Sequence, residues 1–248
     1  KSRLNFMCTV TYLPFNQREF ILTSNRDEDV NRLSALPVQE YKVNNRTVFF
    51  PKDQKANGTW IAYDVKGYTL CLLNGANKPH APQSNYKKSR GLVLLDFYFY
   101  NEPEDFAKLY NFSGIEPFTL ILAYSCSDTE RVKLYELKWN EEKIELTSHD
   151  SSLPQIWSSV TLYSPETIVE RKNWFENWLE KHNTFTSDNI LFFHHFGGNG
   201  STDNDLVMNR TSKKTVSICC ISKSITHTDI IYEDIVNKKI HNSKVINC

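Results

Sequence analysis

Alternating hydrophobic and polar positions near the start of the chain predict a β-hairpin. Residues 8–13 are rich in β-branched and aromatic side chains, residues 14–17 are typical of a turn, and residues 20–23 resume the strand pattern. Antiparallel pairing about this turn places Cys8 opposite roughly residue 25. The spacing therefore brings the Asn-Arg-Asp-Glu sequence of residues 25–28 next to Cys8.

The rest of the chain shows further strand-like and helix-like patterns. Strands are predicted at 59–63, 68–73, 118–124, 132–139, 143–147, 205–209, 215–222 and 228–235, and helices at 89–100, 102–112, 164–182 and 187–196. The helix at 164–182 begins with Ser-Pro-Glu, which is typical of a capped helix start, and the helix at 187–196 ends at two glycines. This order of elements favours a layered α+β fold with antiparallel sheets.

The pattern also indicates how the chain is organised. No repeat, low-complexity tract or linker interrupts it, so we expect a single domain over residues 7–248. Met7 is typical of a natural start, because strand alternation begins directly after it. Residues 1–6 carry no recognisable signal, and we interpret them as a non-native or mis-assigned leader, with a short propeptide as the alternative.

Composition and charge exclude several classes of protein. The 29 basic residues balance the 29 acidic ones without a long run of either sign, so we expect neither nucleic acid nor an anionic membrane as a partner. The apolar runs are too short to form an integral membrane segment, and no signal peptide is recognisable. We expect a cytoplasmic protein whose hydrophobic content, 40%, supports a substantial packed core.

The cysteine positions argue against a metal or disulfide framework. Six cysteines stand at positions 8, 71, 126, 219, 220 and 248, without a Cys-x-x-Cys pair. The adjacent pair at 219 and 220 would point to opposite faces of a strand. We therefore expect most of the cysteines to be small buried hydrophobic residues, and we predict no metal and no cofactor.

Cys8 differs from the other cysteines because it directly follows a methionine. Removal of Met7 would leave Cys8 with both a thiol and a free α-amine, whose pKa of about 7.7–8.0 suits a general base near neutral pH. A nearby arginine would lower the pKa of the thiol, an aspartate could hold the α-ammonium, and an amide could stabilise an oxyanion. The alternative is a packed cysteine beside a solvated turn whose salt bridges contribute little.

The residues around Cys8 resemble a known family. Met7 to Thr11 followed by Thr23 to Glu28 is similar to the signature of the NRDE family, whose eukaryotic members are the transport-and-Golgi-organization proteins. Residues 57–62 with 73–74, 89–91 and 209–211 are similar to further motifs of that family, so the resemblance extends from Met7 to about residue 235.

The resemblance implies a four-layer αββα fold of the N-terminal-nucleophile hydrolase type, distantly similar to bile-salt hydrolases and penicillin V acylases. Carried over by motif, the catalytic roles fall on Cys8, Arg26, Asp27, Asn74 and Arg210. We add Asn25, Glu28 and Trp60 as candidate substrate-binding residues. Those hydrolases have a second asparagine where residues 155–159 offer serines, which argues against bile-salt hydrolysis.

Two functions remain open from the sequence. The first is an N-terminal-cysteine amidohydrolase that acts on a non-peptide carbon–nitrogen bond of a small N-acyl amide. The second is a non-catalytic protein that binds a hydrophobic metabolite, such as an acyl chain or haem, on the same fold. Family members are associated with secretory-pathway organisation and with lipid or haem handling, which fits either function.

One further motif, the adjacent pair His194-His195, could suggest a metal or haem ligand. Adjacent helix positions lie about 100° apart, so the two imidazoles would not share one ion easily. We interpret them as cations near the C-terminal end of a helix.

Overall fold

The computed structural model describes residues 7–80, 83 and 85–247, with only the backbone described at Met7 and Cys8. The expected leader and Cys248 therefore lie outside the described residues. The strands form two antiparallel sheets. The first has the order β10 (Gln155–Ser158), β1 (Met7–Pro14), β2 (Phe20–Asp29), β11 (Lys213–Lys223), β12 (His227–Asp234), β13 (Lys239–Ile246). The second has the order β3 (Leu36–Val43), β4 (Arg46–Lys52), β5 (Ile61–Asp64), β6 (Tyr68–Asn74), β7 (Phe118–Tyr124), β8 (Lys133–Trp139), β9 (Ile144–His149).

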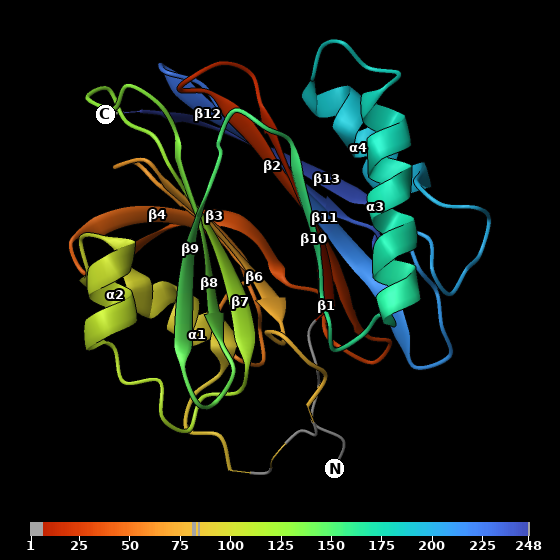
Figure 1. Ribbon diagram of the computed structural model, residues 1–248, viewed down its shortest axis with the longest axis horizontal. Helices are drawn as coiled ribbons and strands as arrows, with labels where there is room; N and C mark the ends of the chain where they lie inside the picture. The colour runs from red at the N-terminus through yellow and green to blue at the C-terminus, as the bar shows by residue number, and fades with distance from the viewer. Residues whose placement is uncertain (1–6, 81–82, 84, 248) are drawn as a thin grey trace.

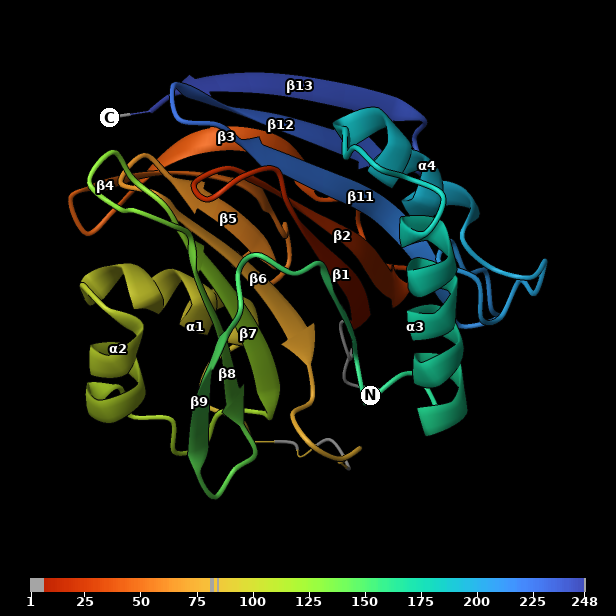
Figure 2. The same ribbon diagram turned by 45° about the horizontal axis from the view of Figure 1, so that its top comes forward.

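Helices cover the outer face of each sheet (Figures 1 and 2). The helices α1 (Arg90–Asp96) and α2 (Pro103–Leu109), joined through the short 3-10 helix η1 (Phe97–Phe99), lie on the second sheet. The helices α3 (Pro165–Leu179) and α4 (Ser187–Phe196) lie on the first sheet. The predicted four-layer αββα arrangement of antiparallel sheets is confirmed.

Strand alternation explains why this arrangement has separate cores. On β1, Val10 and Tyr12 face the second sheet, where they pack in a cluster with Cys71 and Leu73 of β6. The residue after Tyr12, Leu13, packs instead against the α3–α4 layer. Because successive side chains point to opposite faces, each strand of the first sheet contributes to two cores.

The register of the first hairpin agrees closely with the expectation. Cys8 pairs with Arg26, one residue from the predicted partner, and Thr9 pairs with Asn25. The whole Asn-Arg-Asp-Glu segment lies within β2 and is fully buried, because β11 pairs with the other edge of β2 and helices cover its outer face. The alternative of a solvated turn is therefore wrong.

Other elements differ from the sequence predictions. The strand predicted at 205–209 is wrong, since these residues form bends with an isolated bridge at Asn209. Strands β3, β4, β10 and β13 were not predicted. β3 and β13 are edge strands with mostly exposed or half-buried side chains, so they lack a strong hydrophobic alternation. Among the described helices, none is long and apolar enough to cross a membrane.

Candidate active site

The centre of the candidate site is Arg26, which β2 carries on the face toward the second sheet. Its side chain is fully buried, and the guanidinium lies over the Trp60 ring at 4.1 Å from the ring centroid. It donates a hydrogen bond to the Asp53 carboxylate, which follows β4 in the second sheet. A buried arginine thus links the two sheets through an ion pair and a cation–π contact.

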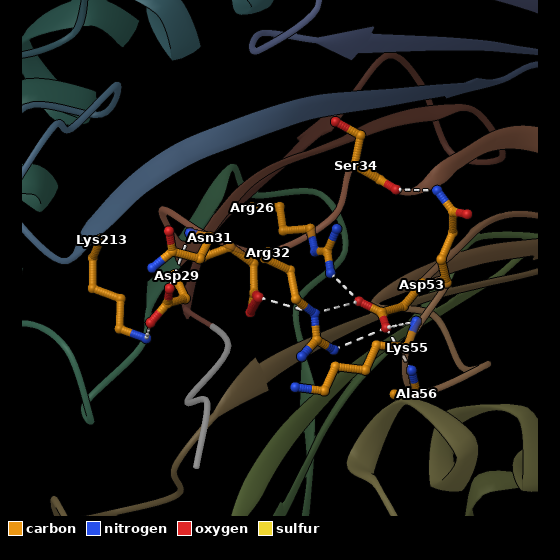
Figure 3. A network of polar contacts seen from close by, with 11 residues as sticks. Arg26, Asp29, Asn31, Arg32, Ser34, Asp53, Lys55, Ala56 and Lys213 are labelled. Carbon is orange, nitrogen blue, oxygen red and sulfur yellow. Dashed lines mark hydrogen bonds and ion pairs between the residues drawn. The ribbon is translucent and has the colours of Figure 1, made fainter. Parts of the chain in front are cut away.

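The Asp53 carboxylate accepts hydrogen bonds from several further donors. Arg32 donates to it through Nε at 3.1 Å and Nη2 at 2.8 Å, and the backbone amides of Lys55 and Ala56 donate to Oδ1 at 3.0 and 2.7 Å. Figure 3 shows Arg26 and Arg32 converging on this carboxylate. These donors hold the pKa of Asp53 below its ordinary value despite the opposing effect of burial, so the carboxylate stays ionised.

Glu28 is the second carboxylate of this network. It is fully buried and lies 3.3 Å from Arg32 Nε. Burial raises the pKa of Glu28 to about 7, although Arg26 and Arg32 act in the opposite direction. The effect of burial on this pKa is larger than that of the two arginines, because both arginines are already paired with Asp53. Near neutral pH, Glu28 is therefore close to half-protonated.

Glu28 is expected to make the stability of the protein pH-dependent. Its pKa is about 7 when folded and 4.5 when exposed, so the folded state binds the proton more tightly. This stabilisation is complete below pH 4.5. It is lost as the pH rises through 7, and the full loss is on the order of 3 kcal/mol. Urea denaturation at pH 5 and at pH 8 should show that the free energy of unfolding falls less between these pH values for Glu28→Gln than for wild type. Equal losses would contradict this, and Glu130→Gln, at an exposed position, is the control.

Asp27 lies on the opposite face of β2, toward the α3–α4 layer. Its carboxylate accepts hydrogen bonds from Tyr163 Oη and from Thr215 Oγ1, the latter at 2.5 Å. Burial raises the pKa of Asp27, and Arg171 and the two hydroxyl donors oppose that effect. The sequence predicted both Arg26 and Asp27 next to Cys8, but β2 carries their side chains on two opposite faces.

Arg171 of α3 organises the helix-side cluster and was not predicted. It is fully buried, lies 3.7 Å from the centroid of the Tyr163 ring, and donates to Thr9 Oγ1 and to the carbonyl oxygens of Asn204 and Asp205. Its position four residues before buried Phe175 is the only sequence signal that could have placed it on the packed face.

Arg210 and Asn25 also lie on the helix side. Arg210 donates to the Asp203 carbonyl at 2.8 Å and lies 5.8 Å from the centroid of the Tyr163 ring. The Asn25 amide donates to the carbonyl oxygens of His194 and Leu206. Both side chains are thus engaged on the helix side, by backbone carbonyls and by the side chains of His194 and Asn204, rather than on the Arg26 face.

The environment of His194 shows that the prediction of a cation at this position is wrong. Its ring contacts Asn25 Oδ1 at 2.5 Å and Thr11 Oγ1 at 2.7 Å, and burial lowers the pKa of His194 to about 3. The neutral ring is therefore a buried link between α4 and the first sheet. His195 instead contacts Glu233 at 2.5 Å, and no metal-binding cluster of histidine, cysteine and carboxylate groups occurs among the described residues.

Asn74 ends β6 and lies beside a separate cavity of about 180 Å³. It is 1% exposed, and neither atom of its amide has a hydrogen-bond partner among the residues that the structure describes. Its carbonyl oxygen accepts a hydrogen bond from Ser159 Oγ at 2.8 Å. Ser159 directly follows β10, which pairs with β1.

The structure therefore divides the predicted residues into groups. Arg26, Glu28 and Trp60 lie together between the sheets, and the register aligns the backbone of Cys8 with Arg26. The Cys8 side chain lies outside the described part of the chain. Asn25, Asp27 and Arg210 lie on the helix side. Asn74 is linked to the N-terminal end of β1 through Ser159. The residues missed from the sequence are Arg32, Asp53, Ser159, Tyr163, Arg171 and Thr215.

Comparisons with known proteins agree with this architecture. A family model described as Transport and Golgi organisation 2 matches residues 7–227. Among solved structures, the chain is similar to a variant of conjugated bile acid hydrolase from Clostridium perfringens, with a TM-score of 0.57 and 12% identity over 95% of this chain and 92% of that chain. A second variant of that hydrolase gives a TM-score of 0.55 and 10% identity over 94% and 92%. At this identity the likeness shows the fold alone. No curated protein sequence matches the chain.

Proposed function

This chain belongs to the Transport and Golgi organisation 2 family, and from that premise we propose that it is an N-terminal-cysteine amidohydrolase. Its substrate is an N-acyl amide with a non-peptide carbon–nitrogen bond. The observation that carries the proposal is the register of β1 on β2, which pairs Cys8 with a fully buried arginine, Arg26. In the proposed mechanism, the guanidinium opposite Cys8 in the ladder favours the thiolate of Cys8.

The reaction uses groups that the chain itself supplies. Removal of Met7 frees the α-amine of Cys8, which accepts the thiol proton. The thiolate attacks the carbonyl carbon, and the amide nitrogen of Asn74 donates to the oxyanion. Collapse of the tetrahedral intermediate breaks the carbon–nitrogen bond, and the α-ammonium gives its proton to the leaving amine. Water then hydrolyses the thioester, releasing the acid and the free thiol of Cys8.

The remaining predicted residues take supporting places in this proposal. Met7 pairs with Asp27 in the ladder, so removal of Met7 leaves the new α-amine next to Asp27, which would hold the ammonium. Trp60 and Glu28 share the Arg26 face and are the substrate-side candidates. Asn25 and Arg210 support the strand from the helix side rather than contacting substrate. The name of the fold neighbours, conjugated bile acid hydrolase, supports a hydrolytic use of this fold.

A second cavity favours the alternative function of a binding protein for a hydrophobic metabolite. This cavity, of about 470 Å³, lies at the far end of β1 and is lined by Pro14, Phe15, Pro154 and Phe185 together with polar residues. A haem ligand would show as Soret absorbance of the purified protein, and an acyl ligand would be found by mass spectrometry of an organic extract.

The pH dependence of Cys8 alkylation tests the amidohydrolase proposal. In protein expressed from Met7, iodoacetamide should label Cys8 with an apparent pKa well below the ordinary thiol value of about 8.5, because Arg26 favours the thiolate. Burial raises the pKa of Cys71 to about 12 and that of Cys220 to about 11, so these thiols are slow internal references. Site-by-site mass spectrometry measures the rates.

The half-buried thiol of Cys126 provides the matched comparison for this experiment. Cys8 should react at least about tenfold faster than Cys126 at pH 7. The proposal fails if Cys8 reacts no faster than Cys126, or if intact-mass measurement shows that Met7 persists on the purified protein.

A further inference from the structure

The turn that follows β6 is held by hydroxyl groups from two other parts of the chain. Ser159 Oγ donates to the carbonyl oxygen of Asn74 at 2.8 Å, and Thr119 Oγ1 of β7 donates to that of Gly75 at 2.9 Å. The amide of Gly75 donates to the Pro117 carbonyl at 3.0 Å. Ser159 and Thr119 are both buried, so these hydrogen bonds are shielded from competing water.

Gly75 shows how tightly the segment after Ser159 packs on this turn. Its φ is +78°, a conformation that side chains rarely adopt. A Cβ at this position would lie 2.4 Å from Thr161 Oγ1 and 2.7 Å from Val160 Cγ2. The turn and residues 159–161 therefore form one closely packed unit.

This unit is joined to the strand that carries Cys8. β10 pairs antiparallel with β1, and its last pair joins Ser158 to Thr9. Ser159 follows one residue later, beside position 8 of the neighbouring strand. The Ser159 side chain thus connects the neighbourhood of Cys8 to the backbone of Asn74, which lies 85 residues before Ser159 in the sequence.

No described residue uses the hydrogen-bonding capacity of the Asn74 amide. It is buried without a partner among the described side chains and backbone groups, an arrangement that costs free energy unless a ligand uses it. It lines the cavity of about 180 Å³ together with Ser158 and Thr119.

From these contacts we propose that Ser159 is a positioning residue. It holds the Asn74 backbone so that the amide nitrogen is preorganised to donate to the oxyanion formed when Cys8 attacks a carbonyl carbon. This inference rests on the proposed function, and it assigns Ser159 no contact with the substrate.

Two reagents separate this role from a merely structural one. p-Nitrophenyl acetate acylates a thiol through a tetrahedral oxyanion, whereas iodoacetamide alkylates it by direct displacement without one. Ser159→Ala should slow acylation of Cys8 by about tenfold or more and leave its alkylation rate unchanged. Asn74→Ala should act in the same way and at least as strongly. Nitrophenolate release and mass spectrometry measure the two rates.

A control variant and two contrary outcomes complete this experiment. Ser148→Ala, on the exposed part of β9, should leave both rates unchanged. If Ser159→Ala is too unstable to purify, Thr119→Val tests the other hydroxyl of the same turn. Loss of acylation in Asn74→Ala but not in Ser159→Ala would overturn the positioning role and leave the proposed function standing. Failure of the wild type to acylate Cys8 at all would overturn the proposed function itself.

Discussion

Replacing Cys8 with alanine is expected to lower the hydrolysis of N-acyl amides by on the order of 10³-fold or more. The variant keeps the α-amine and the oxyanion donor but has no nucleophile, so the covalent intermediate cannot form. A panel of N-acyl aminocoumarin substrates with different acyl groups measures the effect by fluorescence. The screen should first establish turnover by wild-type protein expressed from Met7.

Two further versions of the protein serve as controls in this experiment. Cys126→Ala removes another thiol away from the proposed site and should retain wild-type turnover. A version in which residues 1–6 remain attached keeps the nitrogen of Cys8 in a peptide bond and should be inactive. Turnover that survives in Cys8→Ala would contradict the mechanism, and ligand binding that survives without any wild-type turnover would favour the binding function.

Replacing Asp53 with alanine is expected to lower the free energy of unfolding by about 3–5 kcal/mol, the usual cost of breaking a buried ion pair. The change leaves the buried guanidinium groups of Arg26 and Arg32 without their shared carboxylate. It also removes the acceptor of two backbone amides in the loop that follows β4. Urea denaturation monitored by tryptophan fluorescence measures the change.

Matched variants test the cause of this loss. Asp53→Asn keeps an acceptor for the backbone amides but loses the charge, so we expect an intermediate loss. Asp128→Ala, at an exposed turn, should change stability by less than about 0.5 kcal/mol. If Asp53→Ala lowers the free energy of unfolding by less than about 1 kcal/mol, other groups must stabilise the two arginines, and the expected cost would be contradicted.

The charge network also affects the proposed chemistry. Arg26 and Arg32 carry two positive charges, and Asp53 carries one negative charge across the pH range of interest. With the pKa of Glu28 raised to about 7, protonated Glu28 leaves the cluster with one net positive charge, and ionised Glu28 neutralises it. In the proposed mechanism, the cluster would therefore favour the thiolate of Cys8 more strongly below pH 7 than above it.

Local patterns in the sequence were sufficient for much of the fold. The turn at residues 14–17 and the strands on each side of it defined the hairpin register to within one residue. Ser164, whose hydroxyl accepts from the amide of Thr167, and Gly197, after the end of α4, marked helix boundaries correctly. Such signals are readable because turns, caps and alternation depend on residues close together in the chain.

The separation of Arg26 from Asp27 was not predicted. The strand predicted from alternation ended at residue 23, whereas β2 extends to Asp29 and carries adjacent side chains on opposite faces. Spacing and the family resemblance had together placed both residues next to Cys8. The structure assigns them different partners, Asp53 and Trp60 for Arg26, and Tyr163 and Thr215 for Asp27.

Only the tertiary structure decided which distant residues complete the site. Asp53 reaches Arg26 because the two sheets pack face to face, Arg171 reaches Thr9 from α3, and Ser159 meets Asn74 across 85 positions of sequence. Asp53 and Ser159 belong to no local motif, and only the spacing of Arg171 from Phe175 indicated which face of its helix it occupies. Local sequence determined the register of the strand that carries Cys8, whereas the partners that bury and orient the charges around it depend on how the sheets and helices close upon one another.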